Sequence, residues 1–216
     1  MGMSCILCAS TPVETFETGD GRRFRRCPVC ALVFLDPAQR LSLADERAHY
    51  RLHRNDPEDP RYRAFLSRLA DPLCKRLRPG AEGLDFGCGP GPTLSLMLAE
   101  AGHVMHCHDP AFVPDETLLR RSYDFVTLSE VLEHIHRPAE IFDLLGRLVR
   151  PGGTIAIMTG FLESDIDFER WHYRRDPTHV AFYGGKPLGV LACARGWRFE
   201  SPARNIAFLD IPDAAA

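Results

Sequence analysis

The segment that most constrains this fold is a glycine-rich run, LDFGCGPG, at residues 84–91. Its apolar approach predicts a short buried strand over residues 83–87, and the residues after it predict a helix over 93–101. Glycines at a strand-to-helix turn permit backbone angles that a Cβ would forbid, and they let a ligand contact bare main chain. In α/β proteins that ligand lies at the carboxyl end of the strand, beside the helix N-terminus. The run therefore predicts an α/β fold with a ligand site at this turn.

Further segments continue the alternation of strands and helices. The next predicted strand, residues 103–108, ends at Asp109, about 20 residues beyond the glycines, where nucleotide-binding folds place a ribose-binding carboxylate. Residues 123–128 predict another strand, and 141–149 have helical spacing. The helix-breaking sequence RPGG at residues 150–153 then precedes a predicted strand at 154–159. The glycine spacing is G-x-G-x-G, which differs from the G-x-G-x-x-G of dinucleotide-binding folds.

Together these segments resemble the class I S-adenosylmethionine-dependent methyltransferases. LDFGCGPG is similar to the first motif of that family, Asp109 to its second-strand acid, and YDFVTLSEVLEH…LVRPGGTIAIMT to its fourth-to-fifth-strand region. The resemblance covers about residues 60–210 and implies a Rossmann-like, mostly parallel α/β sheet whose last strand is antiparallel. It also implies contacts with the cofactor S-adenosylmethionine. Asp85 would lie near its amino group, Asp109 would bind the ribose hydroxyls, and its methionine part would contact Gly87, Gly89 and Gly91.

One region departs from that family. Only residues 110–122 separate Asp109 from Tyr123, too few for the usual helix, third strand and loop. We therefore predict a third strand that is reduced or missing and a sheet of six strands, with Asp115 and Glu116 as nominal candidates for adenine contact. Outside this region, residues 61–77 and 186–194 predict helices, and 197–201 and 205–210 predict the final antiparallel hairpin.

The eight cysteines fall into two groups. Two C-x-x-C pairs near the N-terminus have the spacing of a four-thiolate zinc site, whose ligands would be Cys5, Cys8, Cys27 and Cys30. Residues 13–18 and 22–26 predict a hairpin that brings the pairs together, and metal binding would supply the folding energy of so short a segment. Two disulfides are the alternative, which a reducing cytoplasm disfavours. The scattered cysteines are expected to be small buried hydrophobes: Cys74, Cys88, Cys107 and Cys193.

These features divide the chain into a zinc ribbon at residues 1–37, a connector at 38–60 and a methyltransferase domain at 61–216. The connector is polar and contains His49, Tyr50, His53, Asn55 and Asp56. It is either a surface linker or a lid over the active site, because lids need polar and aromatic groups that close over substrate.

A group of titratable residues follows the predicted strand 123–128. Glu130, Glu133 and His134 have the i, i+3, i+4 spacing that places side chains together on a helix. Such a set can hold a divalent cation. The segment is similar to one that holds magnesium in ubiquinone-pathway O-methyltransferases, and small-RNA 2′-O-methyltransferases add a later histidine followed by aromatic residues. The resemblance implies that Glu130, Glu133, His134 and His179 are ligands of magnesium or manganese.

Two alternatives to a metal site remain open. His134 or His179 could be a metal-free general base, since imidazole titrates near neutral pH, or both could be structural. Nearby, the aromatic segment of Trp171, His172 and Tyr173 forms either a wall of the substrate site or part of the core.

Composition limits the partners. The chain has 216 residues, of which 45% are hydrophobic and 25% charged, as in an ordinary globular protein. Its formal net charge of −3 gives no global positive field for nucleic acid. No apolar run has the length of a membrane span, and no signal-peptide pattern begins the sequence, so we expect a cytoplasmic protein with no membrane partner.

The leading functional prediction is a methyltransferase that acts on a small molecule, with oxygen as the acceptor atom. Zinc ribbons also accompany sugar C-methyltransferases and rRNA methyltransferases, which leaves both as alternatives. For RNA, phosphates could contact Arg22, Arg23, Arg25 and Arg26. A non-catalytic binding module is disfavoured by the intact glycine run and by Asp109.

Overall fold

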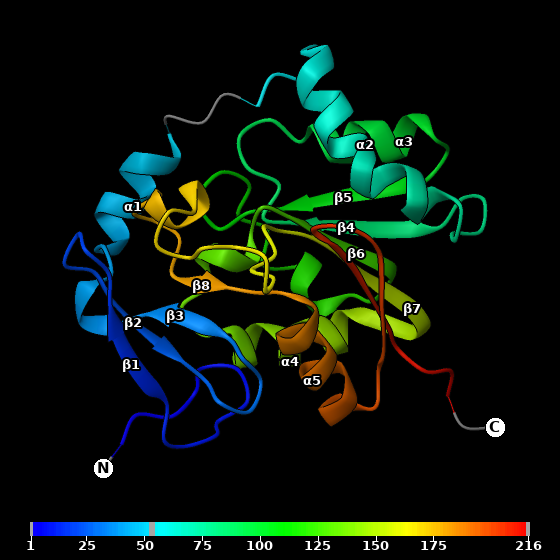
Figure 1. Ribbon diagram of the computed structural model, residues 1–216. Helices are drawn as coiled ribbons and strands as arrows, with labels where there is room; N and C mark the ends of the chain where they lie inside the picture. The colour runs from blue at the N-terminus through cyan, green and yellow to red at the C-terminus, as the bar shows by residue number, and fades with distance from the viewer. Residues whose placement is uncertain (1, 52–54, 215–216) are drawn as a thin grey trace.

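The structure, a computed structural model, describes residues 2–51 and 55–214. Its centre is a six-stranded sheet in the order β5-β4-β6-β7-β10-β9 (Figure 1). Its parallel strands are β4 (Glu82–Phe86), β5 (Val104–His108), β6 (Tyr123–Ser129) and β7 (Val149–Met158). The last hairpin, β9 (Arg198–Ala203) and β10 (Ile206–Asp210), joins β7 in the antiparallel direction. The predicted six strands, with a missing third strand, are confirmed. Within 110–122 the chain forms only the bridge Asp109–Val113 and a short 3-10 helix, Leu118–Arg120.

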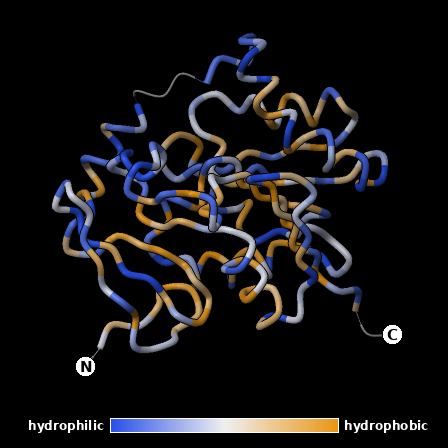
Figure 2. The backbone as a smooth tube through the Cα atoms, viewed as in Figure 1, coloured by the Kyte–Doolittle hydropathy of each residue, from blue (hydrophilic) through white to orange (hydrophobic). Residues whose placement is uncertain are grey.

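Helices cover both faces of this sheet. On one face α2 (Pro60–Cys74) and α3 (Thr93–Glu100) bury one apolar cluster, and on the other α4 (Pro138–Leu148) and α5 (Gly185–Arg195) bury a second (Figure 1). Side chains alternate across the strands, so Phe125 belongs to the first cluster and Val126 to the second. The central strands are accordingly among the most hydrophobic parts of the backbone (Figure 2). None of the helices among the described residues combines the length and apolar character needed to cross a membrane.

The start of the predicted strand 154–159 is wrong by several residues. Strand β7 follows α4 directly and continues through the RPGG sequence, which was expected to be a break. The pairing of β6 with β7 shifts between Tyr123, opposite Val149, and Phe125, opposite Thr154. The irregular register accommodates Pro151, because a residue without an amide hydrogen is tolerated at a bulge.

A second, smaller sheet has the order β1-β2-β3-β8. The predicted hairpin is β1 (Glu14–Glu17) and β2 (Arg23–Arg26), and β3 (Val33–Leu35) adds a strand that the sequence analysis did not include. The fourth strand, β8 (Ala181–Phe182), comes from the segment between β7 and α5 and lies beside β3 (Figure 1). We call residues 5–35 the ribbon. Its buried Leu32 and Phe34 belong to the same apolar cluster as β6 and α4, so the ribbon shares a core with the large sheet.

The connector between the ribbon and α2 contains a helix, α1 (Leu43–Tyr50), that was not predicted. Ser42 caps it by accepting a hydrogen bond from the amide of Asp45 at 3.2 Å. On its inner side the buried Glu46 accepts a 2.7 Å hydrogen bond from His136. His53, named above in this connector, lies outside the described residues, and the choice between linker and lid stays a prediction.

Candidate functional site

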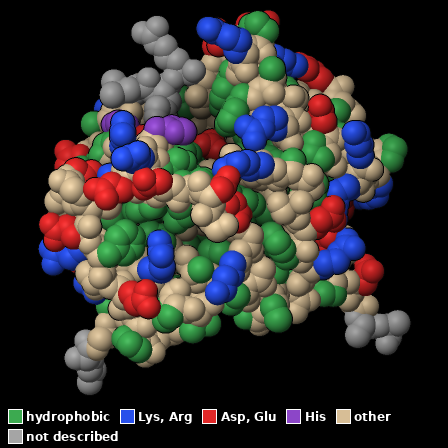
Figure 3. Space-filling model, viewed as in Figure 1, with side chains coloured by type: hydrophobic (Ala, Val, Ile, Leu, Met, Phe, Trp, Pro, Cys, Tyr) green, Lys and Arg blue, Asp and Glu red, His purple; other side chains and the backbone are tan. Residues whose placement is uncertain are grey.

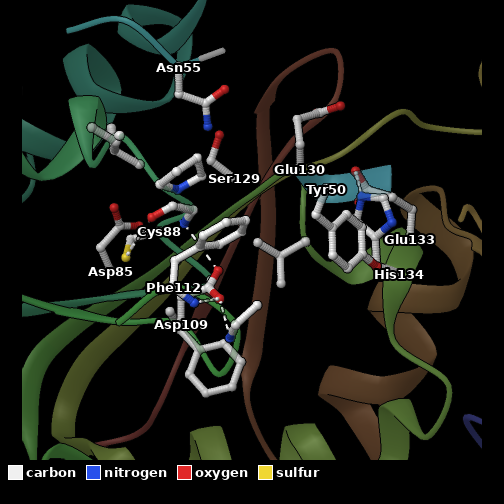
Figure 4. Close-up of a pocket in the computed structure, with 18 of the residues that line it drawn as sticks. Tyr50, Asn55, Asp85, Cys88, Asp109, Phe112, Ser129, Glu130, Glu133 and His134 are labelled. Carbon is white, nitrogen blue, oxygen red and sulfur yellow. Dashed lines mark hydrogen bonds and ion pairs between the residues drawn. The ribbon is translucent and has the colours of Figure 1, made fainter. Parts of the chain in front are cut away.

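A cavity of about 750 Å³ lies at the carboxyl ends of β4, β5 and β6. That volume is within the range of small-molecule sites. One end is formed by the glycine run with Asp85 and Asp109, and the other by Glu130, Glu133 and His134 (Figure 4). His179 completes the lining beside Glu133 and His134. We call these ends the cofactor half and the acceptor half. Helix α1 and the first turns of α2 form the opposite wall.

The glycines of the run are needed by the backbone and by their close neighbours. Gly87 and Gly89 have φ angles of 78° and 67°, in the left-handed region. A Cβ on Gly87 would lie 2.6 Å from Val131 Cγ2, and one on Gly91 only 1.9 Å from the carbonyl oxygen of Asn55. The main chain at this turn is therefore both bare and in close contact with its surroundings.

The carboxylate of Asp109 ties the end of β5 to the glycine run. Its Oδ1 accepts hydrogen bonds from the amides of Ala111 at 2.7 Å and Phe112 at 3.1 Å, and its Oδ2 accepts one from the Gly89 amide at 3.1 Å (Figure 4). The structure thus brings Asp109 against the run, as the spacing predicts. Its ribose contact stays a prediction.

Asp85 is a buried carboxylate in the same half. Its Oδ1 accepts a 2.8 Å hydrogen bond from Thr127 and its Oδ2 a 3.0 Å bond from Ser95. Burial raises the pKa of Asp85 to about 6, against the opposing effect of the two hydroxyl donors. The site therefore penalises its negative charge, a penalty that a bound cation would relieve.

The raised pKa of Asp85 predicts how stability depends on pH. The pKa of Asp85 is higher in the folded protein than its ordinary value of 3.8, so the protonated carboxyl favours the folded state. The stability that this provides is complete below pH 3.8 and is lost as the pH rises through about 6. Asp85→Asn removes the ionisation. The free energy of unfolding of the variant relative to the wild type should therefore rise by about 2 kcal/mol between pH 4.5 and 7.5. Urea titrations at both pH values measure this difference, and a constant difference would contradict the assignment.

The acceptor half contains a compact group of ligating side chains. Glu133, His134 and His179 each offer one ligand atom, and these atoms all lie within 4.8 Å of one another. The helix expected to group Glu130 with Glu133 and His134 is wrong. Only a 3-10 turn, Leu132–His134, forms there, and Glu130 precedes it with a φ of 53°. His179 reaches the group from the turn before β8.

Backbone carbonyls orient both imidazoles. His134 Nδ1 lies 3.1 Å from the carbonyl oxygen of Thr178, and His179 Nδ1 lies 2.7 Å from that of Tyr173. A carbonyl can only accept, so each Nδ1 carries a proton, and in the neutral ring Nε2 is the nitrogen with the lone pair. His134 Nε2 is 3.9 Å from Oε1 of Glu133, a fully buried oxygen with no hydrogen-bond partner among the described residues. Burial also lowers the pKa of His179, which favours its neutral form.

Glu130 lies apart from that group. Its Oε2 accepts a 3.2 Å hydrogen bond from the hydroxyl of Tyr173, whose oxygen is also 3.1 Å from Thr159 Oγ1. Thr159 in turn donates to Glu133 at 2.8 Å, so each of the two neighbouring hydroxyls gives its single proton to one of the carboxylates. Burial, reinforced by the charge of Glu133, raises the pKa of Glu130 to about 8.

Other predicted positions lie elsewhere, and other residues were missed. Asp115 and Glu116 are not among the described residues that line the cavity, and neither are Trp171, His172 and Tyr173. Trp171 packs on Phe182 beside the ribbon, with ring centroids 5.9 Å apart. The aromatic and polar lining that the sequence analysis did not assign comprises Tyr50, Tyr62, Phe65 and Phe112 with Arg47. Helical spacing within α2 could have indicated Tyr62 and Phe65, whereas α1 has no strong apolar periodicity and Tyr50 was named only within a connector that is either a linker or a lid.

The four N-terminal cysteines converge as predicted. Sγ of Cys5 is 3.6 Å from Cys30, and Sγ of Cys8 is 3.5 Å from Cys27. Four thiolates bound to zinc at about 2.3 Å lie about 3.8 Å apart, whereas a disulfide brings two sulfurs to about 2 Å. The free thiols therefore fit a zinc site and not two disulfides. Of the remaining cysteines, which were expected to be buried, only Cys88 is buried. Cys74 and Cys107 are half-buried, and Cys193 is exposed.

Comparisons with known proteins agree with this architecture. A family model described as "Methyltransferase domain" matches residues 48–201. A ubiquinone biosynthesis O-methyltransferase of Sodalis glossinidius is 36% identical over 84 residues, which is 38% of this chain and 34% of that protein. The chain thus spans about a third of the length of such curated relatives.

Solved structures show the same fold at low sequence identity. A 1,6-didemethyltoxoflavin-N1-methyltransferase of Burkholderia thailandensis, solved with S-adenosylhomocysteine, has a TM-score of 0.55 and 16% identity, covering 93% of this chain and 100% of that one. CalO1, a methyltransferase of calicheamicin biosynthesis, has a TM-score of 0.51 and 16% identity, covering 79% and 58%. The chain therefore belongs to the methyltransferase domain family and carries the class I, S-adenosylmethionine-dependent methyltransferase domain that its motifs predict.

Proposed function

We propose that this protein transfers a methyl group from S-adenosylmethionine to a hydroxyl of a small molecule. The observation that carries the proposal is the continuous cavity of about 750 Å³, which joins the glycine run and Asp109 to Glu133, His134 and His179. In the cofactor half, Asp109 would bind the ribose hydroxyls and the buried carboxylate of Asp85 would attract the ammonium group. Bare main chain at Gly87, Gly89 and Gly91 would accept the methionine part.

The cofactor supplies a methyl group activated by a sulfonium. An acceptor hydroxyl in the other half would lie beside the imidazoles, whose Nε2 lone pairs can take its proton. The oxygen–methyl bond forms as the sulfur–methyl bond breaks, so holding the acceptor in line accounts for much of the rate. The aromatic wall of Tyr50, Tyr62 and Phe65 would hold an apolar or aromatic part of the acceptor.

A divalent metal is the second way in which the same residues could assist. Its ligands would be Glu133, His134 and His179, whereas Glu130 is engaged by Tyr173. Two imidazoles and one carboxylate suit manganese or another transition metal better than magnesium, which prefers oxygen ligands. Chelation followed by metal addition separates the two mechanisms. Because a chelator also removes zinc from the ribbon, zinc is restored first, and further rescue by manganese or magnesium indicates a metal in the acceptor half.

The charges of the site favour a small acceptor over RNA. The cavity lining near the acceptor half includes Glu46, Glu133 and Asp176 against Arg47, and repulsion from these carboxylates opposes a polyanion. Acidic and basic side chains are also interspersed on the face shown in Figure 3.

The arginines of the ribbon hairpin are engaged with their own fold. Arg25 pairs with Asp36 at 2.8 Å, and Arg22 donates to the carbonyl oxygen of Arg174. The Arg26 guanidinium lies 5.4 Å from the centre of the Phe16 ring, and Arg23 lies 3.7 Å from Asp36. A phosphate would have to compete with these contacts, so the hairpin offers little support for the RNA alternative.

Binding and turnover test the proposal in two steps. Calorimetry should detect binding of S-adenosylhomocysteine by the purified protein, and a failure to bind would refute the cofactor assignment. Release of S-adenosylhomocysteine from S-adenosylmethionine is then measured with hydroxylated aromatic compounds, sugars and RNA. We expect turnover with a hydroxylated small molecule. Turnover with RNA alone, weakening steeply with salt, would favour the alternative.

A further inference from the structure

The segment that carries His179 into the pocket is held by the ribbon. We call residues 168–183, which connect β7 to α5 through β8, the acceptor segment. Its buried Arg174 donates to Asp20 Oδ2 in the ribbon hairpin at 2.7 Å and to the carbonyl oxygen of Phe168 at 2.9 Å. The Gly19 amide donates to Glu169 Oε1 at 2.8 Å. The turn of the hairpin thus fixes the beginning of the segment by charge-assisted hydrogen bonds.

An aromatic cluster makes the second connection. Phe24 of β2 packs edge-on against Phe168 and Phe182, with ring centroids 4.9 Å and 5.9 Å apart. Phe16 of β1 adds a contact with Phe168 at 5.7 Å. With Val33 and Leu35 of β3, these rings form a separate apolar cluster between the ribbon and the acceptor segment. Burial of such rings is worth several kcal/mol in proteins.

The third connection leads directly to the acceptor half. Strand β3 pairs with β8, and the amide of Leu35 donates to the carbonyl oxygen of Val180 at 2.9 Å (Figure 1). The amide of the same Val180 donates to the carbonyl oxygen of Glu133 at 2.7 Å. Directly before Val180, His179 enters the pocket and Thr178 accepts the hydrogen bond that orients His134. One strand register therefore fixes the three side chains of the group.

The second pair of zinc ligands lies next to the strand that sets that register. The second cysteine pair, Cys27 and Cys30, forms the turn between β2, which ends at Arg26, and β3, which begins at Val33. No hydrogen bond or ion pair, within the ranges 2–51 and 55–214, joins the ribbon to the glycine run or to Asp109. The ribbon thus makes hydrogen bonds with the acceptor half, whereas it is linked to the glycine run only through the apolar core that holds Leu84 and Phe86.

We propose that the zinc-bound ribbon is the positioning element of the acceptor half, fixing the imidazoles of His179 and His134 through β3 and β8. The cofactor half shares only apolar packing with the ribbon, and we expect it to keep its binding geometry without zinc. This proposal depends on the role given above to the acceptor half, but its test uses hydrogen exchange and binding and requires no methyl transfer. A failure to find an acceptor therefore leaves its result intact.

The first test removes zinc from the full chain with a chelator and restores it. Amide exchange of Val180, followed by mass spectrometry or NMR, should speed up at least about 10-fold without zinc and recover when zinc returns. The dissociation constant of S-adenosylhomocysteine should change less than about 2-fold. The proposal would be overturned if the protein purified with no bound zinc, or if removal of zinc left the exchange rate of the Val180 amide unchanged. Joint loss of protection and cofactor binding would also overturn it, because the ribbon would then stabilise the whole fold.

A second test leaves the zinc site intact. Asp20, in the turn of the hairpin, accepts a hydrogen bond from the buried Arg174 guanidinium, and Asp20→Ala removes this partner. The matched control is Glu14→Ala, at an exposed position of the same hairpin. A charge-assisted hydrogen bond of this kind corresponds to about a 10-fold change in local opening. Val180 exchange should rise by that factor in Asp20→Ala and stay at the wild-type rate in Glu14→Ala. Equal rates in both variants would contradict the proposal.

Discussion

His134→Ala should lower kcat about 100- to 10,000-fold for any acceptor that turns over, the range expected when a positioned acid–base group is removed. His134 combines an Nδ1 fixed by the Thr178 carbonyl with an Nε2 that lies near the buried Glu133 carboxylate. No neighbouring side chain can replace both of these contacts of the His134 ring. KM for S-adenosylmethionine should stay near the wild-type value, because the cofactor half is built from other strands.

The matched control for this prediction is His172→Ala, an exposed histidine outside the cavity lining. It should retain wild-type kcat. The pH profile gives a second measurement. Burial lowers the pKa of His179, so activity that depends on its neutral imidazole should persist to lower pH than it would with an ordinary histidine. If the activity of His134→Ala were within a few fold of the wild type, His134 would be ruled out both as the general base and as a metal ligand.

Asp109→Ala should weaken S-adenosylhomocysteine binding about 10- to 100-fold, as measured by calorimetry. The change removes the acceptor expected for the ribose hydroxyls and also the acceptor that holds the Gly89 amide at 3.1 Å. Hydrogen bonds to a carboxylate contribute about 1.5–3 kcal/mol each, and 1.4 kcal/mol corresponds to a factor of ten.

Asp115→Ala is the control for this binding experiment. Asp115 follows in the same loop region but is exposed and accepts its hydrogen bonds from Thr117. Its replacement should leave affinity unchanged. Thermal unfolding of both variants shows whether a loss of affinity is local. Wild-type affinity in a folded Asp109→Ala protein would contradict the ribose assignment.

The sequence predicted the parts of this fold that depend on local signals. The glycines at 87–91 correspond to a particular backbone conformation, and the C-x-x-C pairs to a particular metal geometry. The cofactor turn and the cysteine cluster could therefore both be predicted from residue spacing. The shortage of residues between Asp109 and Tyr123 likewise predicted the missing strand, because chain length alone limits what can form there.

The remainder depends on contacts between distant residues. Strand β8 has only two residues and forms because its backbone pairs with the edge strand β3. No local sequence pattern indicates such a pairing between distant segments. Helix α1 is polar along its length, so its apolar periodicity is too weak to predict. The grouping of Glu133 with His134 and His179 was anticipated by family resemblance, but the expected helix was wrong because Glu130 adopts a left-handed conformation that ends the regular backbone.

The pairing of β3 with β8 has a consequence for engineering and for evolution by domain exchange. A cut made between ribbon and catalytic fold would leave Phe182 and Val180, both buried, without their covering strand. Transfer of the ribbon to another enzyme would therefore have to include residues 168–183 as well. The heritable module is thus discontinuous in sequence, and a recombination event confined to the N-terminus would transfer only part of it.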